Sequence, residues 1–156
     1  MMFYPRPMKR VVAILVVLIS MTPALAGGVT GLLSATDVKI EAYVNQGRTL
    51  AIALLPPSDV TLSGTLGVAF APANDSQPWT DELPRVVTAD ADYFDSPILE
   101  TFPFDRGRLR QPAAIAVTFG ACFSEARICV LEEALITISP ATDGDVDVAI
   151  VLTGGP

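Results

Sequence analysis

The chain has 156 residues, of which 17 are acidic and 10 basic, so its net charge is −7. This balance lacks the basic footprint of a nucleic-acid-binding surface, and we expect no nucleic-acid partner. The sequence has two cysteines and no histidine, which excludes Ser-His-Asp and Cys-His nucleophile pairs, histidine-ligated metals and a closed zinc site. We therefore expect no metal or other cofactor, and the two thiols are the candidates for covalent chemistry.

Residues 1–26 have the pattern of a cleaved export signal. A positive segment holds Arg6, Lys9 and Arg10, an apolar run follows at 11–21, and Ala24-Leu25-Ala26 is a small-x-small cleavage site. The apolar run is shorter than the roughly 20 residues of a membrane-spanning helix. We therefore predict a periplasmic protein that is not inserted in the membrane after signal cleavage, with one domain at 27–156.

The rest of the chain has the alternation of apolar and polar side chains that predicts β-strands. In chain order, the first five expected strands span 38–44, 49–55, 60–70, 85–88 and 98–104. Gly64 interrupts the third of these and predicts a bulge or a bend. Two long loops, at 71–84 and 89–97, flank the fourth expected strand. We expect Trp79 to anchor the first loop by burying its ring.

The best-defined unit is a pair of strands at 113–119 and 128–138, followed by a turn at Asp143-Gly144 and a last strand at 146–152. Glu132-Glu133 interrupts the apolar pattern and indicates an edge or a bulge. No stretch has sustained helical periodicity. Seven to eight short strands, with turn signals about every ten residues, predict an all-β fold: an immunoglobulin-like antiparallel β-sandwich.

Cys122 and Cys129 flank the loop between the strands of that unit. Neighbouring strands lie about 5 Å apart, so a disulfide between the two is sterically easy. One interpretation is an inert staple in an exported domain, although so short a loop contributes only about 2–3 kcal/mol. The other is a redox-active pair, for which Arg127 favours a Cys129 thiolate and Glu125 opposes it. The residues alone leave both interpretations open.

The segment AAIAVTFGACFSEARICVLEEALITI resembles the closing hairpin of the N-terminal periplasmic domain of DsbD-type thiol:disulfide interchange proteins. In that family an apolar strand ends in an aromatic residue, a small residue and the first cysteine, and a short loop leads to the second. The chain has Val130-Leu131-Glu132 after its second cysteine, where the family usually has prolines. The resemblance implies an immunoglobulin-like fold and a role in relaying electrons.

The resemblance also implies roles for individual residues. Cys129 is the expected nucleophile that forms the mixed disulfide, and Cys122 is the resolving thiol. We expect a thioredoxin-like or membrane-embedded thiol reductase as the electron donor, on a separate polypeptide, and periplasmic disulfide-containing proteins as acceptors. The alternative is a non-catalytic exported interaction module with a structural hairpin disulfide.

The segment Asp92-Tyr93-Phe94-Asp95-Ser96 is similar to the cap loop of the same family. There, an acidic and aromatic loop folds over the disulfide and a phenylalanine shields it. The resemblance therefore assigns Phe94 the role of a gate that opens for a docked partner. Asp92 and Asp95 are candidates for assisting proton movement, although acidic loop residues are usually only solvated.

Overall fold

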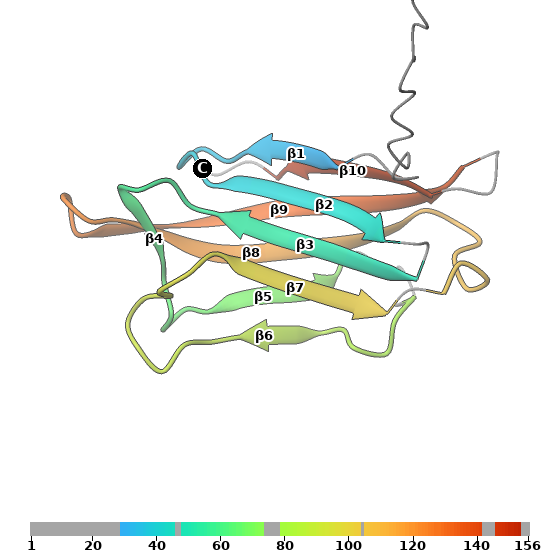
Figure 1. The fold of residues 1–156 in the computed structure, drawn as a ribbon, viewed down its shortest axis with the longest axis horizontal. Coiled ribbons are helices and arrows are strands. Elements are labelled where there is room, and N and C mark those ends of the chain that lie inside the picture. Colours follow the sequence, from blue (N-terminus) through green and yellow to red (C-terminus); the bar gives the residue numbers. More distant parts are fainter. Residues whose placement is uncertain (1–28, 46–47, 74–78, 104, 142–145, 154–156) are drawn as a thin grey trace, which may run out of the picture.

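The computed structural model describes residues 29–45, 48–73, 79–103, 105–141 and 146–153. The predicted signal peptide and the predicted turn at Asp143-Gly144 lie outside these residues. Within them the chain is all-β, as predicted, with ten strands in two antiparallel sheets and no helix (Figure 1). No described segment is therefore a helix with the length and apolarity that crossing a bilayer requires.

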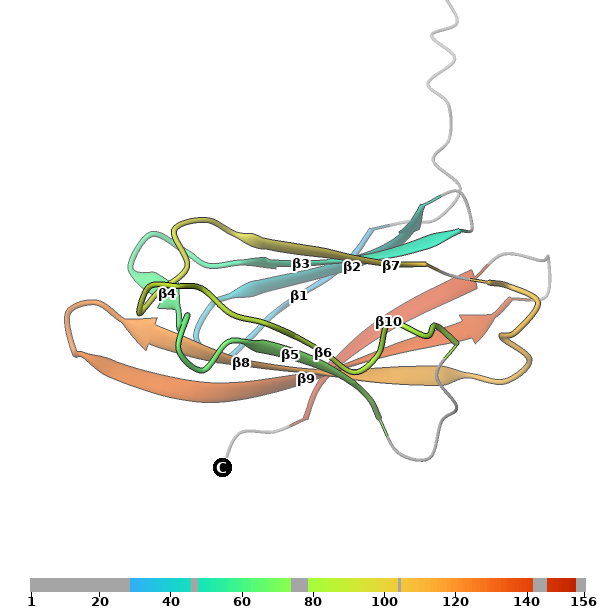
Figure 2. The ribbon, with the colours of Figure 1, turned by 90° about the horizontal axis from the view of Figure 1, so that it is seen from below.

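The two sheets are stacked as layers, which the perpendicular view in Figure 2 shows edge-on. The first sheet has the strand order β1-β2-β3-β7, and the second has the order β10-β9-β8-β5-β6, with β4 also paired to β8. The strands of the first sheet are β1 (Thr30–Leu33), β2 (Lys39–Asn45), β3 (Thr49–Leu55) and β7 (Ile98–Pro103). Those of the second are β4 (Val60–Leu62), β5 (Val68–Pro72), β6 (Arg85–Val87), β8 (Ala113–Phe123), β9 (Ile128–Pro140) and β10 (Val146–Leu152).

The ten strands of the described residues exceed the seven to eight expected, for two reasons. The four-residue strand β1 is too short to show a clear alternation in the sequence. The predicted third strand is divided into β4 and β5 by a bend that begins at Gly64, where a Cβ atom would lie 2.3 Å from the carbonyl oxygen of Ala91. Gly64 therefore marks a close approach of two backbones, and the predicted bend is confirmed.

The core lies between the sheets, and strands such as β2 contribute alternate residues to it, whereas β3 is buried at five consecutive positions. Phe70 of the second sheet and Phe102 of the first pack across it, with ring centroids 5.2 Å apart. Trp79 is 4% exposed, which confirms the predicted burial of its ring. The largest fully buried side chains include Phe70, Phe102, Phe119, Ile40, Leu50, Ile52, Leu54, Leu62, Ile115, Ile136 and Ile138.

Strands β8 and β9 form a long hairpin whose register is continuous from Ala113↔Ile138 to Phe123↔Ile128. The hairpin therefore has no bulge at Glu132-Glu133. Strand β10 pairs with residues 134–140 of β9, so residues 128–133 of β9 form an edge among the described strands. Of the two alternatives that the sequence left open at the paired glutamates, the edge is the one observed.

Candidate functional site

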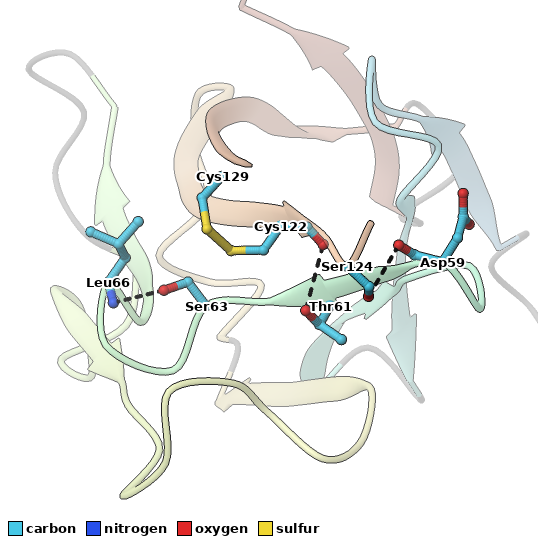
Figure 3. The surroundings of a disulfide bond; sticks show 7 residues. All are labelled: Asp59, Thr61, Ser63, Leu66, Cys122, Ser124 and Cys129. Atoms are coloured by element: carbon cyan, nitrogen blue, oxygen red, sulfur yellow. Dashed lines mark hydrogen bonds between the residues drawn. A yellow bond between two sulfur atoms is a disulfide. The ribbon is translucent and has the colours of Figure 1, made fainter. Parts of the chain in front are cut away.

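The two cysteines form a disulfide across the β8–β9 hairpin (Figure 3). Cys122 and Cys129 are directly opposite each other in the register, with their Cα atoms 3.9 Å apart and their sulfurs 2.08 Å apart. The bond that both sequence interpretations require is therefore present.

The disulfide lies on the outer face of the second sheet, away from the core. Phe119 and Ala121 of β8 belong to the buried core cluster. Because successive side chains of a strand point to opposite faces, Cys122 and its partner Cys129 project outward. A protein that approaches this face reaches the hairpin without opening the sandwich.

The two cysteines differ in exposure although they are paired. Cys122 is 3% exposed, whereas Cys129 is exposed to solvent. Strand β8 is covered on both edges here, by β9 and by β4, and the Oγ1 of Thr61 on β4 lies 3.5 Å from the carbonyl oxygen of Cys122, to which it donates. Cys129 lies on the part of β9 that extends past β10. A reagent or partner therefore reaches Cys129 first.

The loop that connects β4 to β5 crosses the outer face of β8 beside the disulfide. A Cβ atom on Gly120 would lie 2.7 Å from Cδ1 of Leu66 and 3.1 Å from Cβ of Ser63. Figure 3 shows the sulfurs projecting toward the same loop. Neither Leu66 nor Ser63 is among the site residues predicted from the sequence. The available signal was Gly120, since a glycine inside a strand often marks the close approach of another segment.

The predicted cap loop lies at the same end of the sandwich but on the far side of β4. The amide of Gly64 donates to the carbonyl oxygen of Asp92 at 2.8 Å, and the amide of Phe94 donates to that of Leu62 at 3.0 Å. Tyr93 forms a β-bridge with Ser63 and is 46% exposed. Strand β4 therefore separates this loop from β8.

Phe94 is partly buried and packs against the core cluster. Leu62, to which its backbone bonds, also points into the core. Leu66 lies beside the disulfide, and Leu131 lies on the same outer face two positions from Cys129, so a shielding role for Phe94 remains a prediction. Asp92 and Asp95 are exposed, and no described contact brings either to a sulfur.

The two glutamates that follow the hairpin point to opposite faces. Glu132 is 8% exposed, and its Oε1 accepts a hydrogen bond from the amide of Thr36 at 2.9 Å. Its Oε2 is buried and has no hydrogen-bond partner among the described residues. Glu133 lies on the outer face, where its Oε1 accepts from Oγ1 of Thr153 at 2.8 Å. Only Glu133 therefore shares the face of the disulfide.

The tip of the hairpin is a tight turn. Arg127 has a φ of 51°, and its amide donates to the carbonyl oxygen of Phe123 at 3.0 Å. Its side chain and that of Glu125 are both exposed, one of each charge. Among the described residues, no group of three or more cysteine, aspartate or glutamate side chains is arranged to hold a metal ion.

No protein-family model, curated protein or solved structure matches the chain.

Proposed function

We propose that the chain is an exported, periplasmic, immunoglobulin-like domain that relays electrons by thiol:disulfide exchange through Cys122 and Cys129. The observation that carries this proposal is the asymmetry of the disulfide: an exposed cysteine is bonded to a buried one on the outer face of the sheet. An exchanging pair needs one thiol that a partner reaches and a second that is kept in place to resolve the intermediate.

The strand order supports the immunoglobulin-like part of the proposal. In that fold, strands A, B and E are neighbours in one sheet, and C′, C, F and G are neighbours in the other. The orders β2-β3-β7 and β6-β5-β8-β9 follow this arrangement, with the cysteines on the strands that correspond to F and G. Strand β1 lies beyond β2 in the first sheet, and β10 lies beyond β9 in the second. Both are additions to the immunoglobulin-like order.

In the proposed reaction, the reduced pair passes two electrons to a partner disulfide. The Cys129 thiolate attacks one partner sulfur, forms a mixed disulfide and releases the other partner sulfur as a thiolate. The Cys122 thiolate then attacks the Cys129 sulfur, re-forms the bond within the chain and releases the second partner thiolate. The two thiolates take up two protons. A dithiol of a thioredoxin-like or membrane-embedded reductase restores the reduced pair.

A purely structural role accounts less well for the position of the bond. The β8–β9 ladder already pairs eleven residues on each strand, and the cysteines are only seven positions apart. Closing a loop of this length contributes about 2–3 kcal/mol in the entropic model, less than a bridge between distant segments. A purely structural disulfide also gains nothing from the solvent exposure of one of its two cysteines.

The reduction potential of the pair tests the proposal. Equilibration with glutathione buffers, followed by mass spectrometry, is expected to give a value between about −120 and −270 mV, the range of known exchangers. A potential below about −300 mV would identify a structural bond and support the alternative of a non-catalytic interaction module.

Trapping of mixed disulfides is the second test. Cys122→Ser is expected to accumulate a mixed disulfide with an oxidised thioredoxin-like protein, because the resolving thiol is absent. Cys129→Ser is expected to form none at a comparable rate. Ser124→Ala is the matched control, since Ser124 lies in the same hairpin and bonds only to the Asp59 carbonyl oxygen in the described contacts. Equal trapping by both cysteine variants would contradict the assigned roles.

A further inference from the structure

The edge of β9 next to Cys129 has backbone groups that no described strand pairs. The amide of Thr153 donates to the carbonyl oxygen of Glu133 at 3.2 Å, so the backbone groups of Glu133 point toward the β10 side. Alternate residues of an antiparallel strand point the same way. The N–H and C=O groups of Leu131 and Cys129 therefore face this side, where β10 has ended at the pair Leu152↔Ala134.

The same edge is apolar. Ile128 is 57% exposed, Val130 is 38% exposed and Leu131 is 60% exposed. An unpaired strand edge with apolar side chains is a template for the addition of another strand. The edge of the first sheet formed by β7 is less open to another strand, because one of its outward carbonyl oxygens is already bonded. Nη1 of Arg85 donates to the carbonyl oxygen of Thr101 at 3.3 Å.

A pocket of about 260 Å³ adjoins this edge. Its lining is formed by Ala35, Val130, Leu131, Glu132, Glu133, Leu152 and Thr153. Glu132 is nine-tenths buried there, and its Oε2 has no hydrogen-bond partner among the described residues. A buried carboxylate oxygen without a donor is costly, so the pocket is suited to a ligand group that supplies a charged N–H.

We propose that residues Cys129–Leu131 bind an extended segment of a partner protein as an additional antiparallel strand in line with β10, with a lysine or arginine of that segment in the pocket beside Glu132. Main-chain hydrogen bonds to Leu131 and Cys129 hold the segment, and the carboxylate of Glu132 selects its basic residue. A second copy of this chain is a poor occupant, because two-fold antiparallel pairing over Cys129–Leu131 would place Ile128 or Val130 opposite Glu132, and neither supplies a charged N–H to its carboxylate.

The register sets the spacing between two positions of the bound segment, the one opposite Glu132 and the one opposite Cys129. In an antiparallel pair, the residue opposite Glu132 precedes the residue opposite Cys129 by three positions, and the two point to opposite faces. The first enters the pocket on the core side, and the second lies beside the disulfide on the outer face. The implication for thiol exchange, which rests on the proposed function, is a substrate with a basic residue three positions before its cysteine.

A peptide without cysteine tests the binding separately from the redox chemistry. The probe is a fluorescent ten-residue peptide of alternating valine and threonine, with a lysine placed three positions before a serine. Oxidised protein is expected to bind it, and replacing its lysine by glutamate is expected to weaken binding at least tenfold. Methylating the two peptide amides that face β9 is expected to abolish binding, whereas methylating the two alternate amides is not.

Two protein variants complete the test. Leu131→Pro removes an outward N–H and is expected to weaken peptide binding at least tenfold, while Leu99→Pro, an exposed position on the edge of β7, serves as the matched control. Glu132→Gln keeps an acceptor for the Thr36 amide and is expected to lose the preference for lysine over glutamate in the peptide.

Hydrogen exchange gives a readout that does not depend on variants. The amides of Leu131 and Cys129 are expected to exchange fast in the isolated protein and to become protected when the peptide binds. Slow exchange of both amides without peptide would show that the edge is already occupied and would overturn the proposal. Binding that tolerates either methylation pattern would also overturn it. Because the probe has no cysteine and the protein stays oxidised, these results hold whether or not the cysteine pair exchanges.

Discussion

Cys122 and Cys129 are bonded directly across β8 and β9, yet Cys122 is 3% exposed and Cys129 is open to solvent. The difference arises because Cys122 has a neighbouring strand on each side, β9 and β4, whereas the part of β9 that carries Cys129 has β8 on one side and no described strand on the other. The two thiols of the reduced protein are therefore expected to react at different rates.

The first prediction is that iodoacetamide alkylates Cys129 at least about tenfold faster than Cys122 in the reduced protein, because access limits the reaction of a thiolate. Peptide mapping of samples quenched at successive times measures both rates. Unfolding in urea is the control and is expected to bring the two rates within about a factor of two of each other. Equal rates in the folded protein would contradict the assignment of Cys129 as the accessible thiol.

A second prediction concerns Leu66, which lies against Gly120 beside the disulfide. Leu66→Ala is expected to raise the rate of reduction by a water-soluble phosphine severalfold. The stability is expected to change by less than about 0.5 kcal/mol, because the side chain is 56% exposed.

Phe94→Ala is the comparison variant for Leu66, because the sequence resemblance assigns the shielding role to Phe94. Its partly buried ring packs against the core, so its loss is expected to lower the free energy of unfolding by about 1–3 kcal/mol. A rate of reduction in the native state that responds to Phe94→Ala and not to Leu66→Ala would restore Phe94 as the cover.

The third prediction is that Gly64→Ala destabilises the protein by about 1–3 kcal/mol. The added Cβ would meet the Ala91 carbonyl oxygen at 2.3 Å, and backbone cannot move aside as easily as the end of a side chain. Denaturant unfolding measures the change. Gly31→Ala is the matched control, since its nearest contact is an ordinary 3.5 Å and no loss of stability is expected. Equal stabilities for both variants would show that the predicted cap loop is not held against Gly64.

The fourth prediction concerns the contact between the two sheets. Phe70→Ala or Phe102→Ala is expected to cost about 3–5 kcal/mol, because each ring is fully buried and contacts the other across the core. Leu99→Ala, at a position 58% exposed, is expected to cost less than about 0.5 kcal/mol. Urea unfolding midpoints give the comparison. A small effect of both phenylalanine substitutions would contradict a core held between these sheets.

Much of the fold was predictable, because the alternation of apolar and polar residues is local information. It located strands such as Lys39–Asn45 and Val146–Leu152, and the turn-like Gly64 located the bend between β4 and β5. The alternation missed β1, whose four residues are too few for a pattern. It also placed the end of β8 before Cys122, since the small residues Gly120 and Ala121 look like a turn until another segment packs on them.

By itself the sequence determined the class of the domain and the meeting of Cys122 with Cys129, because seven positions of separation across a hairpin leave the two thiols within bonding reach. Only the tertiary structure decided which cysteine is exposed, that Leu66 lies beside the bond, and that Glu132 and Glu133 face opposite sides. These features depend on where β4 and β10 begin and end beside the hairpin, and such contacts between distant segments leave no periodic pattern in the chain.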